Sequence, residues 1–173
     1  MTDLCSVFKN KKKEVFTTII FNTTTMGKEI NTEILINATH EKVWSILTNF
    51  DDYPKWNPFI KSINGDVKVG NKITARIEPP EAKGMTFKPR ILTFETNKEL
   101  SWIGHLFFTG LFDGKHKFEL IDNGNGTTTF KQSENFKGIL LPLLKKQLDN
   151  NTKKGFEEMN KKLKELAELN SNR

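Results

Sequence analysis

DDYPKWNPFI, residues 51–60, is the stretch that decides the fold of this chain. It follows an apolar helical pattern over residues 41–49 and precedes a region rich in strand patterns. Each of its two prolines fixes its own φ angle and disfavours helical geometry at the residue before it, here including Tyr53. The stretch therefore predicts a stiff corner between helix and sheet, in which Trp56 and Phe59 are large enough to plug or edge a cavity.

The regions around the corner show the two-residue period of β-strands. Apolar and polar side chains alternate first over residues 30–36. Six further strands are predicted, one beginning at residues 60–63 and the others over 72–78, 86–96, 100–107, 114–122 and 127–137. The connections between these strands, such as residues 123–126, are short, and short connections join antiparallel neighbours because parallel strands need a long crossover.

A long helix is predicted at the end of the chain, over residues 141–169, with Pro142 in its first turn. Its apolar stripe comprises Leu144, Leu148, Phe156, Met159, Leu163 and Leu166. Gly155 stands in the middle of this helix and costs about 1 kcal/mol relative to alanine. A close approach to the sheet or a kink at a cavity entrance would explain this glycine, and so would neutral drift.

Five short motifs together resemble a known family. They are Trp56-Asn57-Pro58, Phe87-Lys88-Pro89-Arg90, Leu100-Ser101-Trp102, Leu111-Phe112-Asp113-Gly114 and Glu134-Asn135-Phe136. With these motifs, residues 28–169 resemble the START-like helix-grip superfamily (SRPBCC), and within it the polyketide cyclase/dehydrase and lipid transport group. The resemblance implies an α+β helix-grip fold, a curved antiparallel sheet of about seven strands around a long C-terminal helix. It also implies an internal cavity whose ligand varies between members.

The chain divides into two parts on this basis. Residues 1–26 are predicted to be a poorly ordered N-terminal extension, in which residues 15–21 could still add an edge strand. Residues 27–171 are predicted to form one START-like ligand-binding domain.

Composition excludes several kinds of partner. The net charge is +6, but only three of the 27 basic residues are arginine and the lysines of the last helix alternate with glutamates, so no nucleic-acid partner is expected. No apolar run approaches the roughly 20 residues of a membrane-spanning helix, so no integral membrane association is expected. Cys5 is the only cysteine, which excludes an internal disulfide and fits a cytoplasmic location. The three histidines are unevenly placed along the chain, so no metal site is expected. No cofactor is expected either. The protein is expected to be a monomer or a weak dimer.

Strand alternation places Trp102, His116 and Glu134 on the inward face of three consecutive strands, where they are predicted to line one wall of a cavity. A buried carboxylate without a partner is costly. Three interpretations stay open: the two titratable residues contact a ligand, they satisfy each other beneath the long helix, or a β-bulge exposes Glu134 to solvent.

The ligand is expected to contact a larger set of side chains from the corner, the strands and the last helix. This set is Trp56, Asn57, Trp102, His116, Phe118, Gln132, Glu134 and Phe156. The connections at residues 79–84 and 106–112 are expected near the mouth of the cavity, although the second could instead be tucked under the long helix.

Two functions from different classes are predicted. The first is a soluble binding or carrier protein for a small hydrophobic molecule, either a lipid or an aromatic metabolite. The alternative is a polyketide cyclase/dehydratase-like enzyme that uses His116 and Glu134 as acid and base. The arginine-and-tyrosine constellation of the family's cyclases finds no counterpart, because Arg76 and Arg90 are predicted to face away from the apolar side and Tyr53 is the only tyrosine. A role with a protein partner, such as that of a co-chaperone, is also open.

Overall fold

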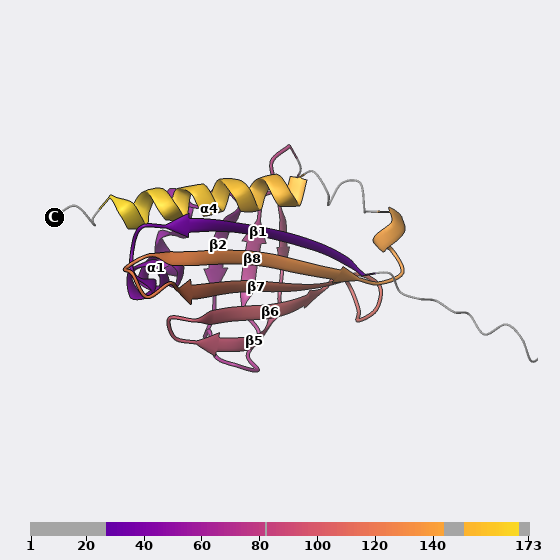
Figure 1. Ribbon diagram of the computed structural model, residues 1–173. Helices are drawn as coiled ribbons and strands as arrows, with labels where there is room; N and C mark the ends of the chain where they lie inside the picture. Colours follow the sequence, from indigo (N-terminus) through magenta and orange to yellow (C-terminus); the bar gives the residue numbers. More distant parts are fainter. Residues whose placement is uncertain (1–26, 82, 144–150, 170–173) are drawn as a thin grey trace, which may run out of the picture.

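The computed structural model describes residues 27–81, 83–143 and 151–169. The predicted N-terminal extension, with its edge strand at residues 15–21, lies outside the described residues. Figure 1 shows the elements, which in chain order are β1 (Lys28–Ile36), α1 (His40–Leu47), the 3-10 turn η1 (Phe50–Asp52), α2 (Tyr53–Trp56), β2 (Ile60–Asn64), β3 (Thr74–Ile77), β4 (Met85–Phe87), β5 (Arg90–Glu95), β6 (Glu99–His105), β7 (Asp113–Asp122), β8 (Thr128–Lys137) and α4 (Lys153–Glu168). In the described ranges, no helix is long and apolar enough to cross a membrane.

The strands form a five-stranded sheet in the order β1-β8-β7-β6-β5 and a three-stranded sheet in the order β2-β3-β4. All pairs of these strands are antiparallel. A bridge between Lys72 and Arg90, together with a 3.0 Å hydrogen bond from the Ile73 N–H to the Pro89 carbonyl, links the two sheets. In Figure 1 the three-stranded sheet crosses behind the five-stranded sheet, and α4 runs along the edge formed by β1. The predicted α+β helix-grip fold is confirmed.

The single strand predicted over residues 86–96 is wrong, because the chain forms two strands there. β4 ends at Phe87 in the three-stranded sheet, and β5 begins at Arg90 in the five-stranded sheet. Pro89 lies between them and has no N–H group to donate to a strand ladder, so an uninterrupted strand is disfavoured at this point. The sheets therefore contain five and three strands where seven in all were expected.

The corner at residues 51–60 contains the short helix α2, and one expectation about it is wrong. Tyr53 was expected outside helical geometry but has φ −51° and ψ −44°. Its N–H bonds to the Phe50 carbonyl, and its buried hydroxyl donates a 2.6 Å hydrogen bond to the Leu47 carbonyl. These contacts outweigh the preference imposed by Pro54, which lies in the first turn of α2, where its missing N–H has no partner to lose.

Helix α4 packs onto the inner side of the sheet through Phe156, Met159 and Leu163, which are all fully buried. A Cβ atom on Gly155 would collide with the ring of Phe59, so a close approach explains this glycine. Of the helix predicted over 141–169, residues 141–143 also form a helical turn, which Figure 1 shows displaced from the axis of α4. The residues between them, including Leu144 and Leu148, lie outside the described part of the chain.

Candidate functional site

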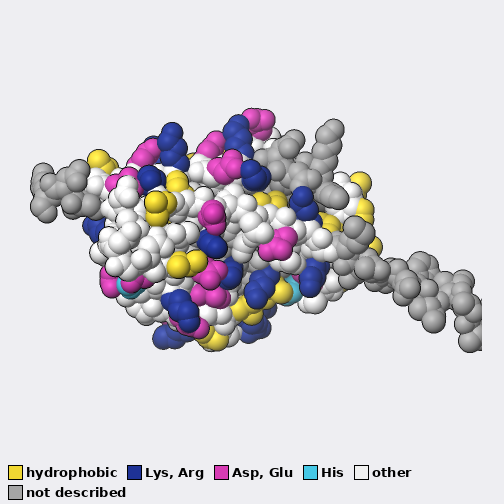
Figure 2. Space-filling view, in the orientation of Figure 1, with side chains coloured by type: hydrophobic (Ala, Val, Ile, Leu, Met, Phe, Trp, Pro, Cys, Tyr) yellow, Lys and Arg dark blue, Asp and Glu magenta, His cyan; other side chains and the backbone are white. Residues whose placement is uncertain are grey.

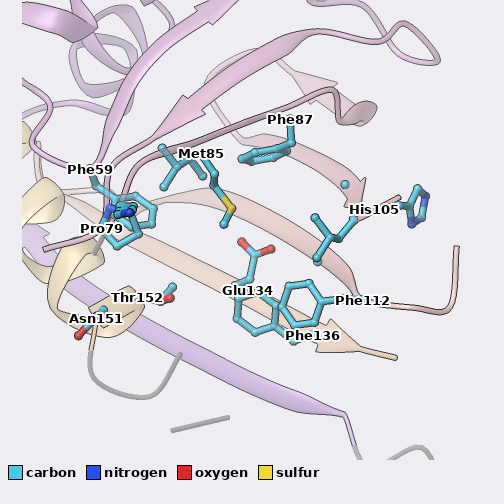
Figure 3. Close-up of a pocket in the computed structure, with 15 residues that line it drawn as sticks. Phe59, Pro79, Met85, Phe87, His105, Phe112, Glu134, Phe136, Asn151 and Thr152 are labelled. Carbon is cyan, nitrogen blue, oxygen red and sulfur yellow. The ribbon is translucent and has the colours of Figure 1, made fainter. Parts of the chain in front are cut away.

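A cavity of about 280 Å³ opens between the two sheets and the start of α4 (Figure 3). This volume is close to the lower end of the roughly 300–1,000 Å³ that is usual for pockets that hold small molecules. The residues that line it come from both sheets, from two connecting loops and from the α4 end: Phe59, Ile77, Pro79, Lys83, Met85, Phe87, Gly104, His105, Leu106, Phe112, Gly114, Glu134, Phe136, Asn151 and Thr152.

Most of this lining is apolar, and its titratable side chains are Lys83, His105 and Glu134. In Figure 3 the carboxylate of Glu134 points into the cavity towards Met85, whereas the His105 ring is turned away at one side. His105 instead pairs with Asp113 at 2.7 Å. Among the described residues, no cluster of His, Cys, Asp and Glu side chains could hold a metal ion.

Two glycines that face each other across β6 and β7 make room for this carboxylate. Gly104 pairs with Gly114 in the sheet register. A Cβ atom on Gly114 would lie 2.5 Å from Oε1 of Glu134, and one on Gly104 would lie 3.1 Å from the ring of Phe87. The missing side chains therefore leave a hollow on the inner face of the sheet, into which Glu134 and Phe87 project.

The position of Glu134 is fixed by a hydrogen bond to His116 on the neighbouring strand β7. The register pairs Trp102 with His116 and His116 with Glu134, so the three side chains form one row across β6, β7 and β8. This row was predicted from strand alternation. Nδ1 of His116 hydrogen-bonds to Oε2 of Glu134, and the side chains are 1% and 13% exposed respectively.

Gln132 contacts the other ring nitrogen of His116. Its amide nitrogen lies 3.4 Å from Nε2 of His116 and can only donate, so Nε2 accepts. In this arrangement Nδ1 carries a proton, which it donates to the carboxylate of Glu134. The His116 ring stacks on Trp102 at 4.8 Å and meets the Phe156 ring nearly at right angles, which fixes its orientation. As a result, Oε2 of Glu134 is occupied within the protein while Oε1 faces the cavity.

Comparison with known proteins identifies the family. The family model described as polyketide cyclase / dehydrase and lipid transport matches residues 28–168. The chain belongs to this family. The predicted membership of the START-like helix-grip group is thereby confirmed. No curated protein matches the chain.

Solved structures share the family fold at low sequence identity. A protein from Mesorhizobium loti has a TM-score of 0.63 and 20% identity, over 83% of this chain and 99% of its own. The Zhui aromatase/cyclase from Streptomyces sp. R1128 has a TM-score of 0.67 and 9% identity, over 82% and 94%. Norcoclaurine synthase from Thalictrum flavum, in complex with dopamine and hydroxybenzaldehyde, has a TM-score of 0.65 and 15% identity, over 90% and 94%. These similarities establish the fold and leave the chemistry of this family member to its own residues.

The residues predicted to contact a ligand occupy three different positions in this family member. Glu134 lines the cavity. His116 lies directly behind it, and the side chains that surround His116 are Trp102, Phe118, Gln132 and Phe156, all buried. Trp56 and Asn57 belong to the corner and are not part of the cavity lining.

The two corner residues make contacts within the fold. Asn57 is 2% exposed, and its Oδ1 accepts the N–H groups of Phe59 and Ile60 at 2.9 and 2.8 Å. Trp56 is half-buried and packs edge-to-face on Tyr53 at 5.2 Å between ring centroids. Asn57 thus fixes the turn that places Phe59 between α4 and the cavity.

Several lining residues were missed by sequence reasoning, among them Ile77, Met85, Phe87 and Phe136. Packed cores and cavity walls use the same apolar residue types, so composition alone does not distinguish them. The available signal was the pair Gly104 and Gly114, since two inward-facing glycines on neighbouring strands mark a hollow. The connections at 79–84 and 106–112 do contribute to the cavity as expected, through Pro79, Lys83, Leu106 and Phe112.

Proposed function

We propose that this family member binds a small, mainly apolar molecule through a hydroxyl or amine group that donates a hydrogen bond to Oε1 of Glu134. The observation that carries the proposal is Glu134, the one carboxylate among the residues that line a mostly apolar cavity, with one oxygen bonded to His116. A partly buried carboxylate gains most from a donor, because hydrogen bonds to charged groups contribute about 1.5–3 kcal/mol.

The same geometry determines what the cavity rejects. A ligand carboxylate at this position would bring two negative charges together with little water to screen them. Both ring nitrogens of His116 have partners within the protein, Glu134 and Gln132, so His116 offers no free donor to a ligand anion. We therefore expect discrimination between a hydroxyl compound and the corresponding carboxylate.

An aromatic ligand suits the cavity, because several phenylalanine rings line it. The rings of Phe112 and Phe136 stack at 5.4 Å and form one side of the cavity, and Phe59 and Phe87 also line it. Offset or edge-on contacts with such rings contribute about 0.5–1.5 kcal/mol beyond area burial. Structures of the same fold include an aromatase/cyclase and a synthase complexed with dopamine and hydroxybenzaldehyde, so the fold can hold aromatic molecules.

An enzymatic function is the second candidate, and the position of Glu134 favours it. A carboxylate that faces a cavity and is oriented by a histidine can accept a proton from a bound substrate, as a general base must. His116 does not line the cavity, so it would act on the reaction through Glu134. Arg76 and Arg90 are exposed and bound to Glu78 and the Gly70 carbonyl, so neither assists in the cavity.

The binding proposal is tested with three probes of one shape: 2-naphthol, 2-methoxynaphthalene and 2-naphthoate. We expect isothermal titration to show that the wild-type protein binds 2-naphthol about tenfold more tightly than the methyl ether, since tenfold corresponds to about 1.4 kcal/mol. We expect 2-naphthoate to bind more weakly than 2-naphthol, because Glu134 repels its carboxylate while Lys83 at the lining offsets this only in part. Glu134→Gln should remove the preference for the hydroxyl compound and strengthen binding of the carboxylate.

Glu29→Gln serves as the control, because Glu29 is exposed on the outer face of β1. It should leave all three affinities unchanged. Equal binding of the three probes by the wild-type protein, or binding of none, would contradict the proposal. The enzymatic candidate predicts in addition that a molecule co-purified from the native host is converted on incubation, and that Glu134→Gln abolishes conversion while binding persists.

A further inference from the structure

Large apolar side chains project into solvent at the end of the molecule beside the cavity. Four of them define what we call the apolar tip: Phe107, Phe108, Ile139 and Leu143, with exposed fractions of 88%, 63%, 77% and 81%. They come from the β6–β7 loop and from the segment after β8. Figure 2 shows hydrophobic side chains gathered at this end, over the helical turn at residues 141–143.

The apolar tip is held in place by the fold. Backbone hydrogen bonds from Ile139 to Gly110 and from Leu140 to Leu111, at 3.1 and 3.0 Å, join the two segments. Phe107 has φ +63°, a conformation that costs a residue with a side chain roughly 1–2 kcal/mol. The loop thus presents its most exposed aromatic ring in a strained conformation.

The tip is continuous with the cavity. Leu106 and Phe112, from the same loop as Phe107 and Phe108, line the cavity. The same loop thus contributes side chains both to the cavity lining and to the tip.

Three lysines belong to segments that adjoin the tip or the cavity: Lys137 stands two residues before Ile139, Lys115 lies near the start of β7, and Lys83 lines the cavity together with Leu106. Lys83, Lys115 and Lys137 are exposed, and none has an ion-pair partner among the residues that the structure describes. The neighbouring Asp113 accepts hydrogen bonds from the Gly110 N–H at 3.0 Å and pairs with His105, so its charge is partly used within the loop. The whole chain carries a net charge of +6.

We propose that the apolar tip inserts into the surface of an anionic lipid bilayer, with the three lysines at the headgroups, so that the cavity opens towards the bilayer. Exposed Phe, Leu and Ile next to Lys is the combination that binds such interfaces. A second copy of the chain fits less well, because a symmetric dimer through the tip would place like-charged lysines against one another. This docking does not depend on the ligand chemistry proposed for Glu134.

The test is co-sedimentation of the full chain with vesicles of phosphatidylcholine alone and of phosphatidylcholine with phosphatidylglycerol. We expect binding to the anionic vesicles that weakens as salt is raised, and much weaker binding to the neutral ones. Phe108→Ser combined with Phe107→Ser should reduce the bound fraction on anionic vesicles about tenfold or more, since it removes both aromatic anchors. Lys83→Gln with Lys137→Gln should reduce the salt dependence.

Val69→Ser is the matched control, because Val69 is as exposed as Phe108, at 63%, but lies outside the tip. It should bind vesicles like the wild type, and circular dichroism should show that all variants are folded. Failure of the wild-type chain to bind anionic vesicles would overturn the proposal, as would unchanged binding by the Phe107/Phe108 variant. A dimer in solution that these two substitutions dissociate would assign the tip to a second copy of the chain instead.

Discussion

Glu134 and His116 form one hydrogen-bonded pair, but only Glu134 lines the cavity. Both nitrogens of His116 are used inside the protein, one by Glu134 and one by Gln132. Glu134 keeps one oxygen for the cavity. The two residues therefore have different consequences when they are replaced, although they form one pair.

Urea unfolding should distinguish these roles. His116→Ala removes a ring packed between Trp102 and Phe156 and leaves a carboxylate without its donor, so we expect a loss of about 3 kcal/mol or more. Glu134→Gln keeps an acceptor for His116 and should cost less than about 1 kcal/mol. His105→Ala, at the exposed edge of the cavity, is the control and should also change little. Wild-type stability of His116→Ala would show that the pair is not part of the fold.

Tyr53 predicts how stability responds to alkaline pH. Burial raises the pKa of its hydroxyl far above the ordinary value of 10.0. Above pH 10 the unfolded chain therefore holds fewer protons than the folded chain, and the free energy of unfolding falls by up to about 1.4 kcal/mol per pH unit from this group. Because Tyr53 is the only tyrosine, the absorbance of tyrosinate should appear together with the loss of the circular dichroism signal. A tyrosinate signal from folded protein near pH 10 would contradict the buried position, and Tyr53→Phe supplies the blank.

At the scale of elements, the packing of α4 depends on a close contact between Gly155 and the ring of Phe59. Gly155 looks unfavourable in a helix, but the ring of Phe59 occupies the place of its missing side chain. Phe59 in turn packs edge-to-face on Phe156 at 5.2 Å. Because position 155 is glycine, α4 can pack directly against Phe59, which belongs to the corner and also lines the cavity.

Gly155→Ala should therefore destabilise the protein although alanine is the better helix former. The gain in helix propensity is about 1 kcal/mol, whereas overpacking costs about 1–3 kcal/mol. We expect a net loss in thermal or urea unfolding. Phe59→Leu in the same chain should recover part of it, and Glu157→Ala, on the exposed face of α4, should have little effect. A more stable Gly155→Ala protein would show that α4 has room to move.

The same elements show what a sequence can and cannot predict here. Strand alternation placed Trp102, His116 and Glu134 in one row, because a period of two leaves only two faces to choose from. The break at Pro89 was missed although the proline is a local signal against an uninterrupted strand. The passage of the chain from one sheet to the other at this point, held by the bond from the Ile73 N–H to the Pro89 carbonyl, is long-range and was not predictable. The cavity itself was only partly predictable, because its walls are made of phenylalanines like those of the core, and its position follows from the two glycines opposite each other.

At the scale of the whole molecule, all helices and strands that the structure describes lie within residues 28–168, and we propose that residues 1–26 are dispensable for folding. A chain that begins at Met26 should therefore unfold within a few degrees of the full chain, because terminal segments generally add little buried apolar area. Differential scanning calorimetry of both chains measures this. A much lower melting temperature of the shorter chain would show that residues 15–21 form an integral strand.

The central claim is that a small aromatic donor enters the cavity above Glu134. Methyl-labelled methionine reports this directly by nuclear magnetic resonance, since of the two methionines that the structure describes, Met85 and Met159, only Met85 lines the cavity. Titration with 2-naphthol should shift the Met85 methyl resonance strongly and saturably through the ring current of the probe. Met159, buried against Gln132, should shift much less. A Met85 signal that stays unchanged while 2-naphthol binds would contradict the account.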